Sequence, residues 1–459
     1  MQDLLLWLDS INSVIWGAPM LILLMGTGLL LTVRLNVLQL TKLPMALKLI
    51  FTAPNEGEGD VSSFKALCTA LAATIGTGNI VGVTTAVAAG GPGALFWMWV
   101  AAFLGIATKY AEGLLSIKYR VTDARGEMSG GPMRYIELGM GAKFIPLAKM
   151  FALFGAAAGI MGIGTTTQAN SIKDAMLGSF GIDPVYTSVV LALIVALVIL
   201  GGLKSIASVS SAVVPFMSVV YFILGLGIVM MHWNEIPAAY DLIIHSAFNG
   251  RAAAGGFGGA VFANAIRSGV ARGIFSNEAG LGSAPIASAA ATTKWPAEQG
   301  LISMTGTFLD TMVVCTITGL SIILTGAWLG DAKGAQMTQA AWADVYPLSG
   351  PYLMTVCLVL FAFTTILGWA YYGERCISYL FGIKSTLPYR IGWVIVVAIG
   401  PFLPLDFVWL LADITNGLMA FPNLIALVGL SGVVVAETKR YFHYLEKRKK
   451  DPDYEEDGI

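Results

Sequence analysis

Charged residues are scarce in this chain. They make up 12% of its 459 residues, whereas 56% are hydrophobic and the mean hydropathy is +0.75. An ordinary soluble domain carries about 25% charged residues, so a soluble enzyme is a poor match and no nucleic-acid partner is expected. The apolar residues gather in runs of about 20, the length of a helix that crosses a bilayer. The sequence therefore predicts a multi-spanning membrane protein.

Cysteine and histidine are also rare, with four and three residues. The cysteines lie inside or at the ends of apolar runs without CxxC spacing, at Cys68, Cys315, Cys357 and Cys376. The histidines fall in expected loops or the tail without an HExxH motif, at His232, His245 and His443. Disulfide frameworks and metal hydrolysis are therefore not indicated. We expect no enzymatic site and no cofactor beyond a coupling ion.

No segment shows strand alternation over its length, and eleven spans is a natural count for a helical protein, so an outer-membrane barrel is a poor alternative. The first apolar run follows Asp3 and Asp9 instead of basic residues, so it is expected to be a retained span and not a signal peptide. The sequence predicts an all-α protein with spans at 11–33, 64–88, 93–117, 147–172, 185–201, 207–231, 253–290, 300–327, 350–375, 388–403 and 408–436.

Lysine and arginine placement predicts the orientation. With the C-terminus in the cytoplasm, inside loops carry 17 basic residues and outside loops three. The N-terminus is then outside, in a cell membrane. The tail 437–459 is expected to be solvated and partly disordered, with lipid binding by its basic cluster as the alternative. A surface helix is expected over 133–138.

Two of these spans are interrupted by residues that weaken a helix. The span 64–88 contains Gly76, Thr77, Gly78 and Asn79, and the overlong span 253–290 contains RGIFSNEAGLGSAP at 272–285. Five spans separate their starts, an odd number, so the two segments enter the membrane from opposite sides. This spacing is typical of an inverted repeat of two five-helix units.

Broken backbone in lipid leaves unsatisfied N–H and C=O groups, so it persists only where it lines an enclosed site. A half-helix N-terminus favours an anion and a half-helix C-terminus favours a cation. Close packing of the glycines is the alternative. A dinucleotide-binding turn at 76–82 is rejected, because no βαβ unit surrounds it.

Four blocks of the sequence resemble the alanine/glycine:cation symporter family, also called sodium:alanine symporters. They are ATIGTGNIVGV (73–83), GGPGALFWMWVAAFLG (90–105), MSGGPMRYIE (128–137) and GIFSNEAGLGSAPIASAA (273–290). The resemblance implies a fold of the leucine-transporter type (LeuT), with ten core helices and one extra N-terminal helix. The parts would be an N-terminal helix and loop (1–63), two repeats (64–231, broken near 74–79, and 232–436, broken near 272–285) and a tail (437–459).

The resemblance also implies sodium- or proton-driven uptake of small amino acids, and the first break is suited to such a zwitterion. Its carboxylate is expected to meet the N–H groups of Thr77, Gly78 and Asn79, where glycine allows close approach. Its ammonium is expected to meet carbonyls around 273–276, including Ser276, and the amide oxygen of Gln168. For Gln168 a structural inter-helix bond is the alternative.

Two aromatic residues, Phe275 and Trp369, are candidates for the apolar walls of the substrate site. Bulky walls exclude large side chains strongly, which suits alanine or glycine. Packing against lipid or a neighbouring helix is the alternative for both.

Adjacent threonines mark a candidate ion site. Thr364 and Thr365 offer two hydroxyls, although threonines in helices often bond carbonyls of their own helix. The LeuT resemblance places this pair opposite the carbonyls of Ala72 and Ile75, with the Phe361 carbonyl as a fifth ligand. Because no carboxylate lies in 364–369, sodium is favoured over a carboxylate-relayed proton.

Charged residues inside the second break are expected to form pairs, because buried ions are normally paired. Glu278 is expected to pair with Arg267 or Arg272 as a structural or gating pair. Proton coupling through Glu278 is the rival hypothesis. Asp310 and Asp413 are the other acidic residues within spans.

The predicted function is therefore sodium-coupled symport of alanine and glycine by alternating access. The alternatives are proton-coupled amino-acid symport and, further off, an amino-acid-gated channel or sensor. The partners are a small amino acid, a cation and the bilayer. The sequence does not fix the preference between alanine and glycine, the selectivity between L and D forms, the stoichiometry or the oligomeric state. A monomer is compatible with it.

Overall fold

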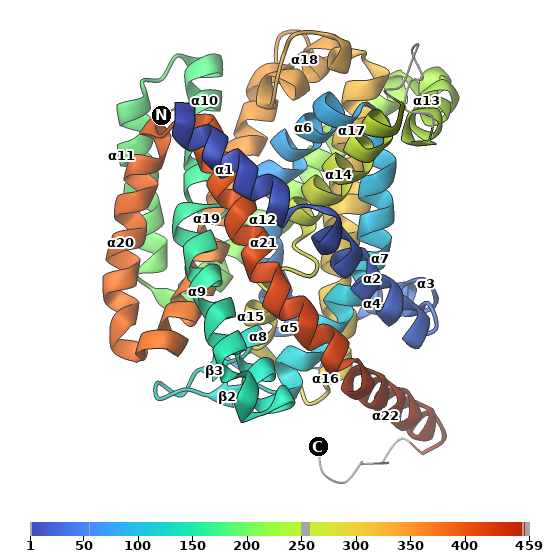
Figure 1. Cartoon of the computed structure of the whole chain (residues 1–459), viewed down its shortest axis with the longest axis vertical. Helices are drawn as coiled ribbons and strands as arrows, with labels where there is room; N and C mark the ends of the chain where they lie inside the picture. Colours follow the sequence, from blue (N-terminus) through green and yellow to red (C-terminus); the bar gives the residue numbers. More distant parts are fainter. Residues whose placement is uncertain (1, 55, 249–257, 452–453, 455–459) are drawn as a thin grey trace.

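The computed structural model describes residues 2–54, 56–248, 258–451 and 454, and it is built almost wholly of helices (Figure 1). The first half of the chain contains α1 (Gln2–Ile15), α2 (Ala18–Arg34), α3 (Leu38–Thr41), α4 (Leu43–Thr52), α5 (Ser63–Thr74), α6 (Val81–Gly90), α7 (Gly93–Lys118), α8 (Pro132–Tyr135), α9 (Ile145–Met161), α10 (Thr166–Phe180), α11 (Pro184–Ile199) and α12 (Gly202–Met231). The second half contains α13 (Ile236–Phe248), α14 (Gly258–Asn277), α15 (Ala284–Ser288), α16 (Pro296–Thr307), α17 (Thr316–Leu324), α18 (Ala335–Val345), α19 (Gly350–Phe381), α20 (Thr386–Ile399), α21 (Leu405–Gly429) and α22 (Ser431–Lys450).

Among the described residues, eight helices are long and apolar enough to cross a membrane, or nine if the bent pair α5–α6 counts as one span. The predicted membrane class and all-α architecture are therefore confirmed, whereas the count of eleven spans is not. One reason is that α11 is apolar but only 16 residues long. The predicted span 253–290 corresponds to α14 and α15, and its residues 253–257 lie outside the described part of the chain.

The first interruption lies where glycine was expected. The helix α5 ends at Thr74, a short 3₁₀ turn covers Thr77–Asn79, and α6 continues at an angle of 51°. In Figure 1 the chain rises from α5 to α6, whereas it descends from α14 to α15. The two interrupted segments therefore run in opposite directions.

A third interruption was not predicted. The expected span 147–172 is two helices, α9 and α10, separated at residues 162–165. Consecutive polar side chains bond the carbonyls that this break releases: Thr165 Oγ1 reaches Ile160 O at 2.7 Å, Thr167 Oγ1 reaches Gly162 O at 3.2 Å, and Gln168 Nε2 reaches Ile163 O at 2.9 Å. The run TTTQ therefore allows a buried helix to break here.

Short strand pairs tie the ends of distant helices together. Before α5, β1 (Val61–Ser62) pairs in parallel with β4 (Ala291–Thr292), which follows α15. Arg120 bridges the two paired segments. Its guanidinium donates to the carbonyl oxygen of Ala291 in β4 at 2.6 Å and to that of Glu58, three residues before β1, at 2.7 Å. Nearby, β2 (Val121–Thr122) and β3 (Met128–Ser129) form an antiparallel hairpin.

Two peripheral segments differ in part from the expectation. Residues 133–138 are helical, in α8 and the π-helical turn Ile136–Met140, but they do not lie wholly on the surface, because Met133, Tyr135 and Ile136 are fully buried. The tail is helical to Lys450 as α22, which buries Tyr441 and packs near α16. Apolar residues within the run KRYFHYLEK explain why it docks.

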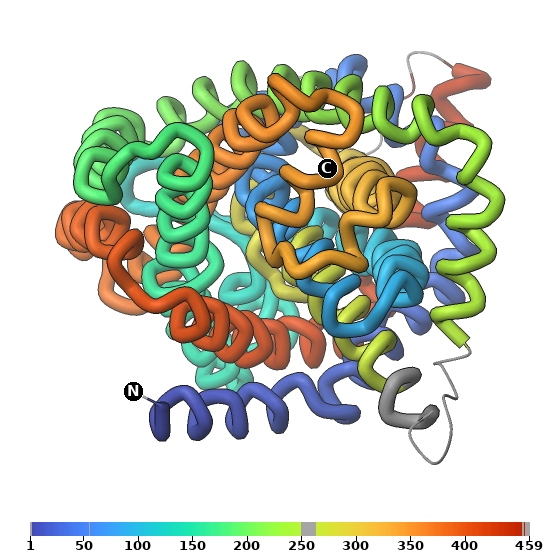
Figure 2. Tube along the Cα trace, turned by 90° about the horizontal axis from the view of Figure 1, so that it is seen from above, coloured from blue at the N-terminus to red at the C-terminus, as the bar shows by residue number. Residues whose placement is uncertain are grey.

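The N-terminal segment covers the outside of the bundle. In Figure 2, α1 and α2 cross one edge of the molecule, while α5 and α6 lie inside it. The helix α2 packs against α7 and α21, and Leu31 is fully buried there. The first break, between α5 and α6, therefore lies in the interior of the bundle.

Candidate functional site

Two backbone amides at the first break bond side chains instead of helix carbonyls. The N–H of Gly76, which would bond the carbonyl of Ala72 in a continuous helix, donates to Asn79 Oδ1 at 2.8 Å. The N–H of Thr77 donates to Gln168 Oε1 at 3.2 Å. The carbonyls at the end of α5 thereby lose their usual helical partners and become available to a cation.

Both glycines of the break are required by close approach. A Cβ at Gly76 would collide with Thr365 Oγ1 and lie 3.3 Å from Gln168 Oε1. A Cβ at Gly78 would lie 2.9 Å from the Cα of Ser276. The first break therefore touches α19, α10 and α14 at once.

The predicted substrate residues of the first break have different hydrogen-bonding states. Asn79 commits its Nδ2 to Asp310, 2.7 Å from Oδ1, so that nitrogen is engaged within the protein. Thr77 is fully buried, and its hydroxyl has no partner among the described residues. Gln168 of α10 links the first break to the third interruption, because its Oε1 accepts from the Thr77 amide and its Nε2 donates to Ile163 O. Thr77 is thus the side chain with free hydrogen-bonding capacity.

A buried carboxylate links the two interruptions. Asp310 lies in the π-helical segment Phe308–Cys315 between α16 and α17. It accepts hydrogen bonds from Asn79 in the first break, from Ser276 Oγ of α14 at 2.9 Å, and from Thr311 Oγ1 at 2.7 Å. The sequence showed Asp310 within a span but gave it no partner, because the π-helical geometry that aims it inward has no clear sequence signal.

Four of the five predicted sodium ligands lie together. Thr365 Oγ1 donates to Phe361 O at 3.0 Å and to Ile75 O at 3.4 Å. Thr364 Oγ1 also donates to Phe361 O at 3.0 Å, with Met217 Sδ at 3.6 Å. Ala72, the fifth, is buried in the last turn of α5, which packs on α19.

The second break is a left-handed turn held by acidic side chains. Glu278, Gly280 and Gly282 have positive φ angles of 57°, 89° and 81°. Glu112 of α7 accepts the amides of Gly280 and Gly282 at 3.1 Å each, and Asn423 donates to the same oxygen at 2.7 Å. The turn is therefore fixed from α7 and α21.

Two charged residues of α7 were missed by the sequence reading. Lys109 and Glu112 are both buried, and Lys109 Nζ donates to the carbonyl of Asn277 at 2.9 Å. They lie three positions apart inside the predicted span 93–117, on one helix face. Charge within a span was the signal that could have identified them.

The expected pairing of Glu278 with an arginine is wrong. Glu278 Oε1 accepts from Trp369 Nε1 at 2.7 Å, and Oε2 accepts from Ser283 Oγ at 2.6 Å. Arg272 instead forms a two-pronged ion pair with Asp413. Within the described part of the chain, no ion pair joins Glu278 to Arg267 or Arg272.

The two candidate wall residues have defined neighbours. Phe275 borders Gly78 and stacks on Trp409 with ring centroids 4.9 Å apart. Trp369 is fully buried. It packs closely on Gly164 in the third interruption, where an added Cβ would lie 2.5 Å from the Cβ of Trp369. Phe275 therefore lies beside the first break, whereas Trp369 faces the second and third.

Helical spans that break and meet around buried polar groups are typical of secondary transporters, and this is the class that the fold and the site define. The sequence matches the sodium:alanine symporter family over residues 1–456, and the chain belongs to that family of transporters, which are not enzymes.

Similar proteins agree with this assignment. The chain is 57% identical to an uncharacterized transporter of Haemophilus influenzae, over 97% of this chain and 98% of the relative. It is 52% identical to the sodium/alanine symporter AgcS of Methanococcus maripaludis, over 96% and 98%. It is 35% identical to the probable sodium/glutamine symporter GlnT of Bacillus subtilis, over 98% and 92%.

Proposed function

We propose that the chain is a sodium-coupled symporter that takes up alanine and glycine by alternating access. The observation that carries the proposal is that the residues before and after Gly76 offer different groups, carbonyl oxygens for a cation and a free hydroxyl for a substrate. The Thr365 hydroxyl contacts the carbonyls of Phe361 and of Ile75, the residue before Gly76, whereas the hydroxyl of Thr77, the residue after Gly76, has no partner among the described residues. The 52% identity to a protein named a sodium/alanine symporter supports the same substrate and ion.

The amino acid is proposed to bind where the first break meets α14. Its carboxylate would be held by the Thr77 hydroxyl and the Gly78 amide at the start of the second half-helix. Asn79 would act through Asp310 and not by direct contact, because its amide is engaged there. Phe275 and Ser276, which border Gly78, would close the side-chain pocket, and Gln168 would orient the Thr77 amide.

Sodium is proposed to bind between α5 and α19. Its ligands would be the carbonyls of Ala72, Ile75 and Phe361 with the hydroxyls of Thr364 and Thr365, an all-oxygen set that suits a hard cation. In that state Thr365 would turn its hydroxyl hydrogen away from the ion, replacing the bonds to Ile75 and Phe361.

We infer that the architecture is a LeuT-type inverted repeat, with repeats at 64–231 and 232–436, an N-terminal unit at 1–63 and the tail at 437–459. The opposite directions of the two broken segments support this assignment. The proposed orientation has the N-terminus outside and α22 in the cytoplasm. Arg272, paired with Asp413, is the proposed gating arginine, and Arg267 has no assigned contact in this scheme.

Proton-coupled symport is the second candidate, because Glu278 and Asp310 are buried carboxylates beside the breaks. Labelled alanine uptake into proteoliposomes separates the two. Accumulation under an imposed sodium gradient, at equal pH on both sides, is the expected result. Accumulation only under a proton gradient would replace sodium by protons, and gradient-independent equilibration would indicate a channel or uniporter. Unlabelled glycine should compete in the same assay, and glutamine should compete poorly.

A further inference from the structure

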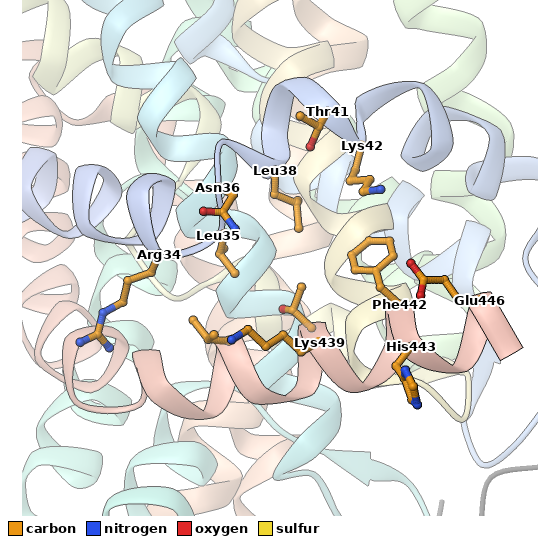
Figure 3. A pocket seen from close by; sticks show the side chains of 12 residues that line it. Arg34, Leu35, Asn36, Leu38, Thr41, Lys42, Lys439, Phe442, His443 and Glu446 are labelled. Atoms are coloured by element: carbon orange, nitrogen blue, oxygen red, sulfur yellow. The ribbon is translucent and has the colours of Figure 1, made fainter.

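A groove lies between the N-terminal segment and α22, away from the interruptions. It has a volume of about 540 Å³. Figure 3 shows Leu35, Leu38 and Lys42 on one wall and Lys439 and Phe442 on the α22 wall. Its size falls in the range of small-molecule sites.

The lining of the groove is basic. Arg34, Lys42 and Lys439 contribute three cations, and Glu446 is the one carboxylate among the lining residues. In the described part of the chain, none of these three cations takes part in an ion pair. Arg34 donates to Ser431 Oγ at 2.7 Å, a neutral partner, and Lys42 Nζ lies 4.5 Å from the centre of the Phe442 ring. The groove thus carries a net positive charge, with three cations against one carboxylate.

The groove is placed at the boundary of the membrane. The candidate span 2–34 ends at Arg34, and the span 405–429 ends just before α22 begins. On the helices that adjoin Lys42, Leu40 of α3 is 61% exposed and Phe51 of α4 is 81% exposed, as is typical of residues facing lipid. Its apolar wall of Leu35 and Leu38 suits the start of an acyl chain.

The turn that forms one wall is held in an unusual conformation. Asn36 and Val37, between α2 and α3, have φ angles of 53° and 54°. Left-handed backbone at a β-branched residue is rare, and such conformations persist where the surroundings enforce them. The backbone of this wall is therefore held in one conformation by its surroundings.

We propose that this groove binds the phosphate headgroup of an anionic phospholipid. Lys42 and Lys439 face the phosphate from opposite walls and supply charge-assisted hydrogen bonds, and Leu35, Leu38 and Phe442 contact the glycerol and the first acyl carbons. Basic pockets between membrane helices are suited to such headgroups. The assignment does not depend on the transport proposal.

The test is native mass spectrometry of the full-length protein in detergent, with phosphatidylglycerol as the probe. The double variant Lys42→Gln/Lys439→Gln removes charge from both walls. Lys449→Gln/Lys450→Gln removes the same charge from exposed positions at the end of α22, outside the groove. We expect the groove variant to bind phosphatidylglycerol roughly thirtyfold more weakly than wild type. The control should bind like wild type.

Two further measurements distinguish an anionic phospholipid from a zwitterionic lipid and from free phosphate. Phosphatidylcholine, which is zwitterionic, should show no difference between the two variants, and millimolar inorganic phosphate should not displace phosphatidylglycerol. Equal phosphatidylglycerol affinity in groove and control variants would overturn the proposal, and displacement by inorganic phosphate would overturn the lipid assignment. If the double variant does not fold, the exposed Lys439→Gln alone should weaken binding about fivefold.

Discussion

Trp369 Nε1 donates a hydrogen bond of 2.7 Å to Glu278 Oε1, joining α19 to the turn that follows α14. The helix that carries the proposed sodium threonines is thereby bonded to the second break. The other oxygen of Glu278 is held by Ser283, so the carboxylate braces both ends of its own turn.

This bracing predicts different outcomes for two substitutions of Glu278. Glu278→Gln keeps a carbonyl oxygen for Trp369 and should retain sodium-driven alanine uptake. Glu278→Leu leaves the buried Trp369 and Ser283 donors unpaired, at about 1–3 kcal/mol each, and should lower thermal stability and uptake. Selective loss of ion coupling in a well-folded Glu278→Gln protein would instead support proton coupling.

Two glycines of the first broken span should respond oppositely to alanine. Gly78→Ala would place a Cβ 2.9 Å from the Cα of Ser276, a backbone atom that cannot yield easily, so alanine uptake should be lost. A Cβ at Gly82 would lie 4.0 Å from its nearest neighbour, within α6. Gly82→Ala should therefore raise stability by up to ~1 kcal/mol. Proteoliposome uptake and thermal unfolding distinguish them; equal tolerance would contradict the close approach.

The proposed sodium site makes a prediction for Thr365. Thr365→Ala removes one oxygen ligand and should raise the half-saturating sodium concentration about tenfold. Thr365→Ser keeps the hydroxyl and should stay near wild type. Sodium titration of alanine uptake measures both, and unchanged sodium dependence in the alanine variant would remove Thr365 from the site.

The bond between Asn79 and Asp310 can be tested by exchange. Asn79→Asp brings two carboxylates together, and Asp310→Asn replaces a charged acceptor shared by Asn79, Ser276 and Thr311 with an amide that has one acceptor oxygen, so each single variant should be destabilised. The double variant restores an amide–carboxylate pair in reverse and should recover stability, with a coupling energy of about 0.5–3 kcal/mol. Additive effects in thermal unfolding would show that the contact has no energetic weight.

The β2–β3 hairpin predicts a pH dependence of stability. Burial alone would raise the pKa of Asp123, but amide hydrogen bonds from Glu127 and Arg125 and the charges of Arg375 and Arg125 outweigh it and lower that pKa. A lowered pKa contributes stability above the unfolded value of about 3.9, and this contribution is lost as pH falls through the folded pKa.

Asp123→Asn should therefore lower the unfolding temperature at pH 7, and the difference from wild type should shrink as pH falls below 4. Arg375, which Asp123 contacts at 2.8 Å, would lose one partner and keep Glu127. Asp331→Asn, at an exposed position, is the matched control and should show no such difference. A difference that is constant with pH would rule out the ionised Asp123 as its cause.

The membrane class, the all-α fold and the position of the first break could be predicted because they depend on local sequence. Hydrophobic length marks spans, and the residues of the GTGN run have low helix propensity. The break at 162–165 carried a comparable signal in GIGTTTQ. It could not be distinguished from a continuous span, because the hydrogen bonds by which Thr165, Thr167 and Gln168 satisfy the released carbonyls are visible only in the structure.

Partner choice could not be predicted from local patterns. Glu278 lies six residues from Arg272 in sequence, yet α14 carries Arg272 toward α21 and the left-handed turn directs Glu278 toward α19. Asp310 meets Asn79 only because a π-helical segment and a broken helix face each other. Such contacts depend on the packing of several helices at once.

The parallel pairing of β1 with β4 has a mechanical consequence. The half-helices α5 and α15 are joined by backbone hydrogen bonds at their ends remote from the breaks, and Arg120 bridges the two joined segments. Because each joined end lies across its helix from the break, a tilt of α5 about Gly76 would be transmitted to α15 through this pairing.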